Sequence, residues 1–491
     1  MTLRELALLL PGSVLTGAGD GIVTEVTHDS RRVAQGALFV AIRGYAQDGN
    51  AYVEAARKKG ALGVVSEAEA QPGGPWLKVK DAREALALLS AAVLDHPADR
   101  LELVGITGTN GKTTTAYLVD AMLRAASRTV GLLGTVQYRI AGRLQEAIRT
   151  TPEASDLQHL FKDMVDAGCT HGVLEVSSHS LSLQRVLGCR FKVAVFTNLT
   201  RDHLDFHGDM DGYFAAKRLL FESYLREDGT AVLNLDDTRG EELRQIARGK
   251  VLTYALERDA DFRAESIELS LRGTRFLART PAGAFPVETL LVGRFNVQNV
   301  LAALGAAFAL GVRPEEALRG ITSLTGVPGR LERVEAGQDF TVVVDYAHTD
   351  DALKNLLETL RELKPRRLIT VFGCGGDRDK TKRSLMGQVA SRLSDVVILT
   401  SDNPRSEPPE AILEDIGRGI PKNRDAQIEV VADRRDAIAR ALEGAGPGDV
   451  VAIAGKGHET YQVLRDRTVP FDDRQVAREL LGRLLVKGAR R

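Results

Sequence analysis

Cysteine is scarce in this sequence, and the few that occur are far apart. Cys169, Cys189 and Cys374 are three in number among 491 residues, and none is spaced for a zinc site. An odd, scattered set of thiols suits a reducing compartment rather than an oxidising one. We expect all three to be packing residues.

An excess of charge of either sign is also lacking. The chain has 65 lysine and arginine residues against 66 aspartate and glutamate residues, so no global field draws it to nucleic acid or to an anionic membrane surface. Any anionic substrate must be met by local groups. The N-terminus lacks a basic export signal, and the apolar run 6–10 is too short to span a bilayer. We expect a cytoplasmic monomer without membrane insertion or a nucleic-acid partner.

Short apolar strands alternate with helical stretches through most of the chain. Residues 38–80 read as a small α/β unit. From Leu101 the strands LELVGIT, HGVLEV, KVAVFTN and TAVLNLD are separated by longer helical segments, which is typical of a mostly parallel sheet covered on both faces. Beyond the turn-rich segment 326–337, five more apolar strands alternate with helices and predict a doubly wound sheet.

This pattern predicts an α/β protein of three domains. At roughly 150 residues per domain, the length of 491 residues agrees with that number. We expect a small N-terminal α/β domain at 1–98, a central domain at 99–330 with a mostly parallel sheet like that of P-loop ATPases, and a Rossmann-like C-terminal domain at 331–491.

The segment LELVGITGTNGKTTTAYLVDAML reads as a strand, a glycine-rich turn and a helix. In this arrangement backbone N–H groups and the helix N-terminus hold phosphate. Lys112 would reach the terminal phosphates of ATP and Thr113 would bind magnesium. The usual phosphate-loop pattern has glycine where this chain has Ile106, with Gly108 falling inside the loop instead. ATP binding alone leaves motors, kinases and ligases open.

The variant GITGTNGKTTT resembles the phosphate loop of the Mur ligases and of the related folylpolyglutamate synthetases. Further matches follow in order along nearly the whole chain, including TTPE, LEVSSHSL, TNLTRDHLDFHG, YFAAKRLLF, GRFNVQN, GVPGRLE, VVDYAHT, GCGGDRDKTKR, SDNPR and AGKGHE. The N-terminal segment THDSRRVAQGALFVAIRGYAQDG resembles the uridine-nucleotide segment of members that add the third residue of the peptidoglycan stem peptide. The resemblance implies a ligase that uses ATP to join a carboxylate to an amine through an acyl phosphate.

Such chemistry brings anions together, so divalent cations must neutralise charge. The resemblance implies Thr113 and Glu175 as ligands of one Mg²⁺ and His203 as a ligand of a second. Lys217 matches a lysine that the family carries as a carbamate, which supports the second magnesium. Carbamylation requires a neutral amine, which desolvation or neighbouring cations would supply. Without their flanking motifs these residues would read as a solvated carboxylate, a structural histidine and a surface lysine.

The resemblance also implies a nucleotide site that is completed at the second domain boundary. Many relatives read YAHTP where this chain has Asp350 after Thr349. We expect little effect, because a loop proline mainly sets stiffness. Tyr346 is expected to line the same side of the site. The residues expected to bind ATP are Gly108, Thr109, Asn110, Gly111, Lys112, Thr113, Thr114, Asn296, Arg330, Asp345 and His348.

By the same resemblance, hydroxyls and an arginine hold UDP-N-acetylmuramoyl-L-Ala-D-Glu. These groups suit phosphate and carboxylate oxygens. The residues are Thr150, Thr151, Ser177 and Arg185, with Ser30 and its neighbours Asp29 and Arg31 at the uridine nucleotide. Taken alone, TT is a common strand dipeptide and DSR a common turn, so only their order in the chain makes them persuasive.

The amino acid to be added is expected to bind in the third domain, where the DNPR motif resembles that of relatives that use meso-diaminopimelate. The far end of diaminopimelate carries a second carboxylate that a guanidinium can grip, whereas lysine ends in an ammonium that arginine repels. Lysine or ornithine stays possible. The expected contacts are Arg378, Asp402, Asn403, Arg405, Gly455 and Glu459.

Two alternatives remain open at this point. One is another ligase of the same superfamily, such as a folylpolyglutamate synthetase or a Mur ligase that adds a different peptide unit; the DSR segment and DNPR argue against it. The other is a P-loop protein that uses ATP as a switch without ligating anything. Such a protein would not need the DNPR and AGKGHE motifs in a separate domain.

Overall fold

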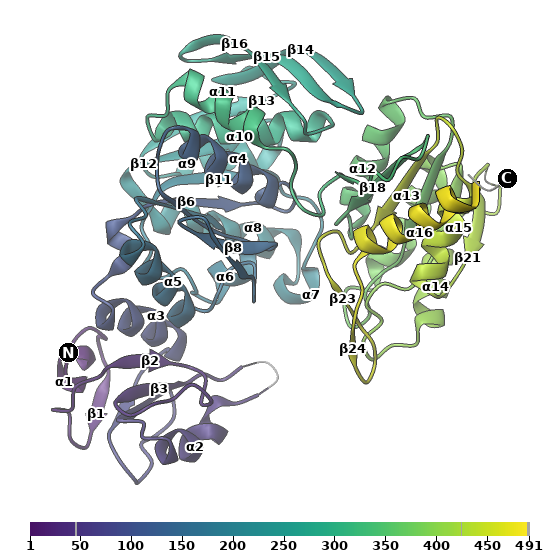
Figure 1. Ribbon diagram of the computed structural model, residues 1–491. Helices are drawn as coiled ribbons and strands as arrows, with labels where there is room; N and C mark the ends of the chain where they lie inside the picture. The colour runs from purple at the N-terminus through teal and green to yellow at the C-terminus, as the bar shows by residue number, and fades with distance from the viewer. Residues whose placement is uncertain (45–46, 424, 489–491) are drawn as a thin grey trace.

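The computed structural model describes residues 1–44, 47–423 and 425–488 and contains three separate sheet-based units (Figure 1). The N-terminal unit is a five-stranded sheet of order β1-β5-β4-β3-β2, in which only β1 runs antiparallel to its neighbour. Its strands are β1 (Val14–Thr16), β2 (Glu25–Thr27), β3 (Ala37–Ala41), β4 (Gly63–Ser66) and β5 (Trp76–Lys78). Its helices are α1 (Leu3–Ala7), η1 (Gly49–Tyr52), α2 (Val53–Lys58) and α3 (Ala82–Val93), and the short η2 (Pro97–Arg100) follows.

The central unit is an eleven-stranded sheet of order β16-β15-β14-β13-β12-β11-β6-β10-β7-β8-β9. Its middle strands pair in parallel, while β7-β8-β9 and β14-β15-β16 form antiparallel extensions at the two edges. The middle strands are β6 (Glu102–Thr107), β7 (Val130–Leu133), β10 (His171–Glu175), β11 (Phe191–Phe196), β12 (Leu225–Asn234) and β13 (Lys250–Ala255). The edge strands are β8 (Gln137–Ile140), β9 (Arg143–Glu146), β14 (Phe262–Ser270), β15 (Gly273–Thr280) and β16 (Gly283–Thr289).

Helices cover both faces of the central sheet. One apolar core lies under α4, α10 and α11, and a second lies under α5 and α8 on the opposite face. The parallel strands are continuous apolar runs because both of their faces are buried. The helices are α4 (Lys112–Ala125), α5 (Ala154–Asp166), α6 (Ser178–Ser182), α7 (Leu204–His207), α8 (Met210–Leu219), the π-helix η3 (Leu220–Tyr224), α9 (Thr238–Ile246), α10 (Arg294–Ala309) and α11 (Pro314–Ser323).

The C-terminal unit is a six-stranded sheet of order β17-β18-β22-β19-β20-β21, parallel except for β17. Helices α12, α13 and α14 cover one face, and α15 and α16 cover the other. Its main strands are β17 (Glu332–Arg333), β18 (Thr341–Asp345), β19 (Leu368–Phe372), β20 (Val396–Leu399), β21 (Gln427–Val430) and β22 (Val450–Ala454), and the hairpin is β23 (Tyr461–Val463) and β24 (Thr468–Pro470). Its helices are α12 (Asp350–Glu362), α13 (Thr381–Leu393), α14 (Pro409–Gly417), α15 (Arg434–Gly444) and α16 (Asp473–Gly488).

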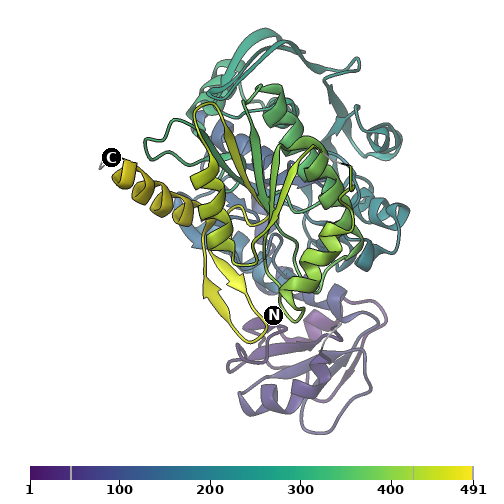
Figure 2. The same ribbon diagram turned by 90° about the vertical axis from the view of Figure 1, so that its right-hand side faces the viewer.

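The predicted fold class is confirmed: the chain is α/β, with a large mostly parallel central sheet and a doubly wound C-terminal sheet. Figure 2 shows the N-terminal sheet below the other two. The central sheet starts at Glu102 and the C-terminal sheet at Glu332; the domain boundaries after 98 and 330 stay predictions. The three cysteines are buried, as expected. Within the described residues, no helix is long and apolar enough to cross a membrane.

Candidate functional site

The glycine-rich turn connects β6 to α4, the predicted position of a phosphate loop. Gly108 has a φ of +150°, and a Cβ there would lie 1.8 Å from the Thr197 Oγ1 at the end of β11. The same Cβ would lie 3.0 Å from the backbone N and O of Asn198, so only glycine fits at this position. Ile106, where the usual pattern has glycine, is instead a fully buried residue of β6. In this chain the position that requires glycine is therefore 108, two residues after the position at which the usual phosphate-loop pattern has it.

Two lysines converge on this loop. Lys112 donates hydrogen bonds to the carbonyls of Gly108 at 3.0 Å and Thr109 at 2.8 Å, and Lys217 of α8 donates to the same Gly108 carbonyl at 2.8 Å. Burial lowers the pKa of both amines, and the nearby charge of Lys112 lowers the pKa of Lys217 further. Lys217 is only 1% exposed, so the alternative of a surface lysine is excluded.

Oxygen atoms suited to a hard cation lie beside the loop. Glu175, at the end of β10, accepts hydrogen bonds on Oε2 from the Thr113 hydroxyl at 2.9 Å and the Thr135 hydroxyl at 3.0 Å. A hydroxyl and one carboxylate next to a phosphate loop fit a magnesium ion that completes its shell with phosphate oxygens and water. No cluster of three or more histidine, cysteine or acidic side chains suited to a metal occurs among the described residues.

His203 lies across the loop from Glu175, at the start of α7. Its Nε2 is 3.4 Å from an oxygen of Asp202, and its ring stands beside the rings of His179 and Tyr213. Burial lowers the pKa of His203 to about 3, which keeps the imidazole neutral at pH 7, the form that binds metals. The Lys217 nitrogen lies 4.4 Å from the centre of the Tyr213 ring, so His203 and Lys217 flank the same tyrosine.

Lys112, Thr113, Glu175 and His203 line a cavity of about 330 Å³ between the central and C-terminal sheets, which we call the central cavity. Lys217 is not among its lining residues. This volume lies in the range of small-molecule sites. Of the predicted residues, it is lined by Thr109, Asn110, Gly111, Lys112, Thr113, Thr114, Thr150, Glu175, Ser177, His203, Arg330, Asp345 and His348.

The C-terminal side of the central cavity is formed by Arg330, which precedes β17, and by residues 345–348 at the end of β18. Arg330 donates a hydrogen bond to the Thr113 hydroxyl at 3.2 Å, and its guanidinium lies 4.5 Å from the centre of the Tyr346 ring. Asp345 accepts hydrogen bonds from the backbone of Leu331 and Ala347, so it shapes this segment. Burial lowers the pKa of His348 to about 4.

Two of the residues expected to bind ATP, Gly108 and Asn296, are not among those that line the central cavity. Asn296 is buried in the first turn of α10, where its amide donates to the Val292 carbonyl at 2.8 Å and accepts from Asn299 at 3.0 Å. Asn299, not Asn296, lines the central cavity. Sequence reasoning also missed Asn198 and Asp202, although both lie inside the quoted TNLTRDHLDFHG motif.

The expected substrate residues gather where the N-terminal and central sheets meet. Thr151 donates to the Glu175 carbonyl at 2.7 Å, Ser177 caps α6, and Arg185 donates to the Thr151 carbonyl at 3.2 Å. Ser30 lies in a turn on the N-terminal sheet. The flanking His28 and Arg32 contact Ser155 and Asp156 at the start of α5, which brings this turn toward Thr151.

Glu153 was missed by the sequence analysis. Its carboxylate pairs with Arg185 at 2.7 Å and has Arg83 at 3.9 Å and Arg149 at 4.0 Å. A carboxylate enclosed by three guanidinium groups leaves an excess of positive charge at the junction of the two sheets. Such an excess is suited to an anionic ligand.

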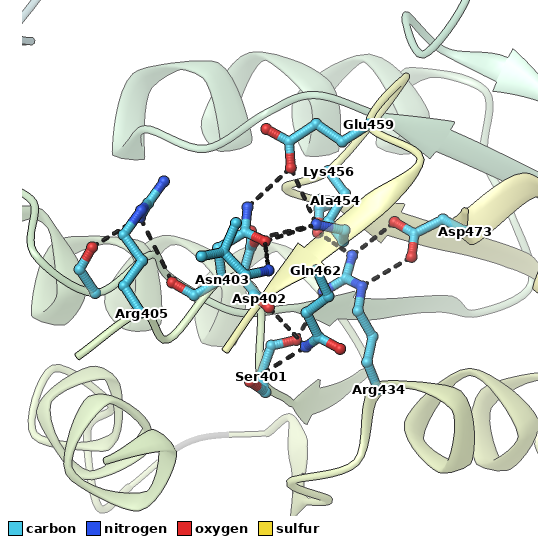
Figure 3. A network of polar contacts seen from close by, with 12 residues as sticks. Ser401, Asp402, Asn403, Arg405, Arg434, Ala454, Lys456, Glu459, Gln462 and Asp473 are labelled. Atoms are coloured by element: carbon cyan, nitrogen blue, oxygen red, sulfur yellow. Dashed lines mark hydrogen bonds and ion pairs between the residues drawn. The ribbon is translucent and has the colours of Figure 1, made fainter. Parts of the chain in front are cut away.

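Four residues of the third predicted group, Asp402, Asn403, Arg405 and Glu459, cluster on the C-terminal sheet with Lys456, which was not predicted; we call these five the C-terminal polar cluster (Figure 3). Asn403 donates to Glu459 Oε2 at 2.9 Å. Arg405 donates through Nη1 to the Gly376 carbonyl at 2.7 Å, while another of its nitrogens points out of the network. Gly455 lies in the same loop as Glu459, and Arg378 is exposed next to Arg405. The partial burial of Arg405 lowers the pKa of its guanidinium, and the nearby charge of Arg378 lowers that pKa further.

Polar contacts join the central and C-terminal units across the cavity. Asp351 accepts hydrogen bonds from Asn110 at 2.8 Å and Thr200 at 3.0 Å. Asp350 pairs with Arg201 of the central unit at 3.2 Å. Asp350, which stands where many relatives have proline, therefore adds an ion pair between the central and C-terminal units. The expectation of little effect considered only the stiffness of the loop and did not include this ion pair.

Known proteins match the chain along nearly its whole length. The model of the Mur ligase family, catalytic domain, matches residues 22–93, that of the Mur ligase middle domain matches 106–307, and that of the Mur ligase, glutamate ligase domain, matches 329–457. A protein of Solibacter usitatus (strain Ellin6076) named UDP-N-acetylmuramoyl-L-alanyl-D-glutamate–2,6-diaminopimelate ligase is 52% identical over 462 residues, which cover 94% of this chain and 93% of that protein.

Solved structures of Mur ligases are also similar to this chain. A structure described as UDP-N-acetylmuramoyl-L-alanyl-D-glutamate–2,6-diaminopimelate ligase is 35% identical, covers 99% of both chains and has a TM-score of 0.69. The MurF ligase of Thermotoga maritima in complex with ADP has a TM-score of 0.66 at 19% identity and covers 96% of this chain and 100% of that one. At this lower identity the likeness is one of fold.

Proposed function

This chain belongs to the Mur ligase family, and from that premise we propose that it joins meso-diaminopimelate to UDP-N-acetylmuramoyl-L-alanyl-D-glutamate with the conversion of ATP to ADP and phosphate. The observation that carries the proposal is the pairing of two sites. A phosphate loop with Lys112, Thr113 and the neighbouring Glu175 lies on the central unit, and a cluster with an arginine, a lysine and two carboxylates lies on the C-terminal unit.

The two sites are connected through one loop. Tyr346, which lines the central cavity, packs against His458, with ring centres 5.0 Å apart. His458 directly precedes Glu459 of the C-terminal polar cluster. An amino acid held by that cluster would therefore have its reacting amine directed toward the cavity in which phosphate transfer takes place. Proximity of this kind converts a slow bimolecular step into a fast one.

The reaction has two steps. A carboxylate oxygen of the dipeptide attacks the terminal phosphorus of ATP, and ADP leaves, which gives an acyl phosphate. The amine nitrogen then attacks the acyl carbon, loses a proton, and phosphate leaves as the amide forms. Backbone N–H groups of the loop and Lys112 hold the phosphates in line throughout.

Magnesium fits the oxygen atoms of Thr113 and Glu175, with His203 beside a second position, and when bound there would neutralise phosphate charge. We propose that Lys217 carries a carbamate at this place. Its lowered pKa supplies the neutral amine that carbon dioxide requires, and burial protects the product from solvent. We propose that the reaction takes place in the cytoplasm, where ATP is available.

The direct test is to measure ADP release from ATP, magnesium and the UDP-linked dipeptide with each candidate amino acid in turn. We expect diaminopimelate to give a higher kcat/KM than lysine or ornithine, because its second carboxylate matches Arg405. A higher value for lysine or ornithine overturns the specificity and leaves the ligase intact. Absence of ADP release with every amino acid contradicts the proposed function itself.

Arg405 offers a sharper test of how the amino acid is recognised. Replacing Arg405 by alanine should weaken diaminopimelate by about 2 to 5 kcal/mol, because a partly desolvated charge pair is broken. That loss corresponds to an increase in KM of about 30-fold to several thousand-fold. The KM values for ATP and for the UDP-linked dipeptide should stay close to wild type.

A matched variant, Arg405→Lys, separates charge from geometry. Lysine keeps the positive charge but loses the planar fork that grips a carboxylate in two places, so we expect an intermediate KM. Unchanged KM for diaminopimelate in Arg405→Ala would remove Arg405 from the amino-acid site.

A further inference from the structure

Lys456 is a cation buried at the centre of the C-terminal polar cluster. It is 0% exposed, and its ammonium lies 3.0 Å from Glu459 Oε2, 3.1 Å from Asn403 Oδ1 and 3.7 Å from Asp402 Oδ1 (Figure 3). A fully buried lysine is rare because its desolvation is costly, and it persists only where partners compensate it. All three of its partners are residues that we expect to contact the amino acid.

The position of Lys456 fixes which atoms face the ligand. Asn403 Oδ1 accepts hydrogen bonds from both Lys456 and the backbone N–H of Val463 at 2.9 Å, so the amide group has one orientation. Its nitrogen must then point to Glu459 Oε2. Lys456 and Asn403 together occupy Oε2, and in the described part of the chain Glu459 Oε1 has no hydrogen-bond partner. Oε1 is therefore the atom offered to a ligand ammonium.

Lys456 also sets the charge of the cluster. The carboxylates of Asp402 and Glu459 face the cations Lys456 and Arg405, and Arg378 lies exposed next to Arg405. Diaminopimelate carries equal numbers of ammonium and carboxylate groups, whereas lysine carries one excess positive charge. Loss of Lys456 makes the surroundings of the ligand more negative by one charge, which favours the cationic amino acid relative to the neutral one.

The backbone around the cluster is hydrogen-bonded by side chains other than Lys456. The fully buried ion pair of Arg434 and Asp473, 2.7 Å apart, fixes the Ala454 carbonyl at 3.0 Å through Arg434. Gln462 donates to the Asp402 carbonyl at 2.6 Å. The two loops thus keep their places through contacts that do not involve Lys456, which leaves the charge and the orientation of side chains as its contribution.

We propose that Lys456 is a specificity-determining positioning residue: it orients Glu459 and Asn403, and its charge makes the cluster favour an amino acid with a second carboxylate over one that ends in an ammonium alone. The inference rests on the proposed function as a diamino-acid ligase. It adds a residue that does not itself touch the ligand and acts through those that do.

The test compares kcat/KM for diaminopimelate and for lysine in wild type, Lys456→Met, Lys456→Gln and Lys456→Arg. Methionine has a similar length and no charge, glutamine keeps a hydrogen-bond donor without the charge, and arginine keeps the charge. We expect the preference for diaminopimelate over lysine to fall about tenfold or more in the two neutral variants, as for loss of one charge in a partly desolvated pocket. It should be largely retained in Lys456→Arg, with KM for ATP unchanged in all.

The outcomes are distinguishable. Equal losses for both amino acids with an unchanged preference would mean a structural role and would overturn the inference. Thermal unfolding of each variant identifies any that fails to fold. If Lys456→Met does not fold, the comparison is made with Lys456→Gln instead. Amino-acid-dependent ADP release by the wild type, measured first, separates failure of this inference from failure of the proposed function.

Discussion

Replacing Lys112 by alanine should abolish ADP formation while the protein keeps its fold. Among the described residues, the Lys112 amine donates hydrogen bonds to the carbonyls of Gly108 and Thr109, which belong to the loop and not to an apolar core. In the proposed mechanism its charge acts on the phosphate that passes from ATP to the dipeptide, and loss of such a group lowers kcat by about 10³-fold or more. ADP release under saturating substrates measures the effect.

Stability gives this prediction a second readout. Lys112 and Lys217 bring two amines to one carbonyl oxygen, and the charge of Lys112 lowers the pKa of Lys217. Lys112 is bonded to carbonyls of the loop rather than packed in an apolar core, so the melting temperature of Lys112→Ala should stay close to that of wild type. A matched control is Lys250→Ala, at an exposed strand end, which should retain the wild-type rate. Retained turnover in Lys112→Ala would remove the phosphate loop from the mechanism.

The second large effect is expected at Lys217. If this residue carries a carbamate that supports magnesium, Lys217→Ala should be nearly inactive, because the metal loses an anionic partner where phosphate charge accumulates. A small carboxylic acid such as acetate should then occupy the vacated space beside Gly108 and Tyr213 and restore part of the activity. The measurement is ADP release by the variant across a series of acetate concentrations.

Added amines provide the contrasting arm of this experiment. If Lys217 acts as an unmodified ammonium, small amines should restore activity better than small acids. Rescue by amines alone would rule the carbamate out. The same additions to wild type and to Lys250→Ala control for effects of ionic strength, which screens exposed charges in every variant alike.

Much of the fold could be predicted from the sequence because its signals are local. The buried parallel strands β6, β10 and β11 are continuous apolar runs, and the turn before α4 has the glycines that its backbone requires. The antiparallel edge strands β14, β15 and β16 were not predicted. Their side chains alternate between buried and exposed without long apolar runs, so they give a weaker signal.

The site was predicted less completely, for reasons that individual residues show. Asn296 and Asn299 lie in one motif three residues apart, and only the packing of α10 decides which of them faces the cavity. Lys456 reads in sequence as an ordinary solvated lysine, because its burial depends on loops that are far apart along the chain. Glu153 gains its significance from arginines on three separate segments.

The three loops around the C-terminal polar cluster, residues 373–378, 401–405 and 454–459, all follow the carboxyl ends of parallel strands of one sheet. Substitutions in these loops can alter which amino acid is accepted, because the phosphate loop lies on another sheet and is not affected. Amino-acid specificity can therefore change in evolution without a change in the residues that bind ATP. The loops are not equally free to diverge. A Cβ at Gly457 would lie 2.7 Å from the Cβ of Tyr346, so the loop 454–459 is tied to the wall of the central cavity. Evolutionary change in specificity should therefore concentrate in the other two loops, and 454–459 should drift most slowly.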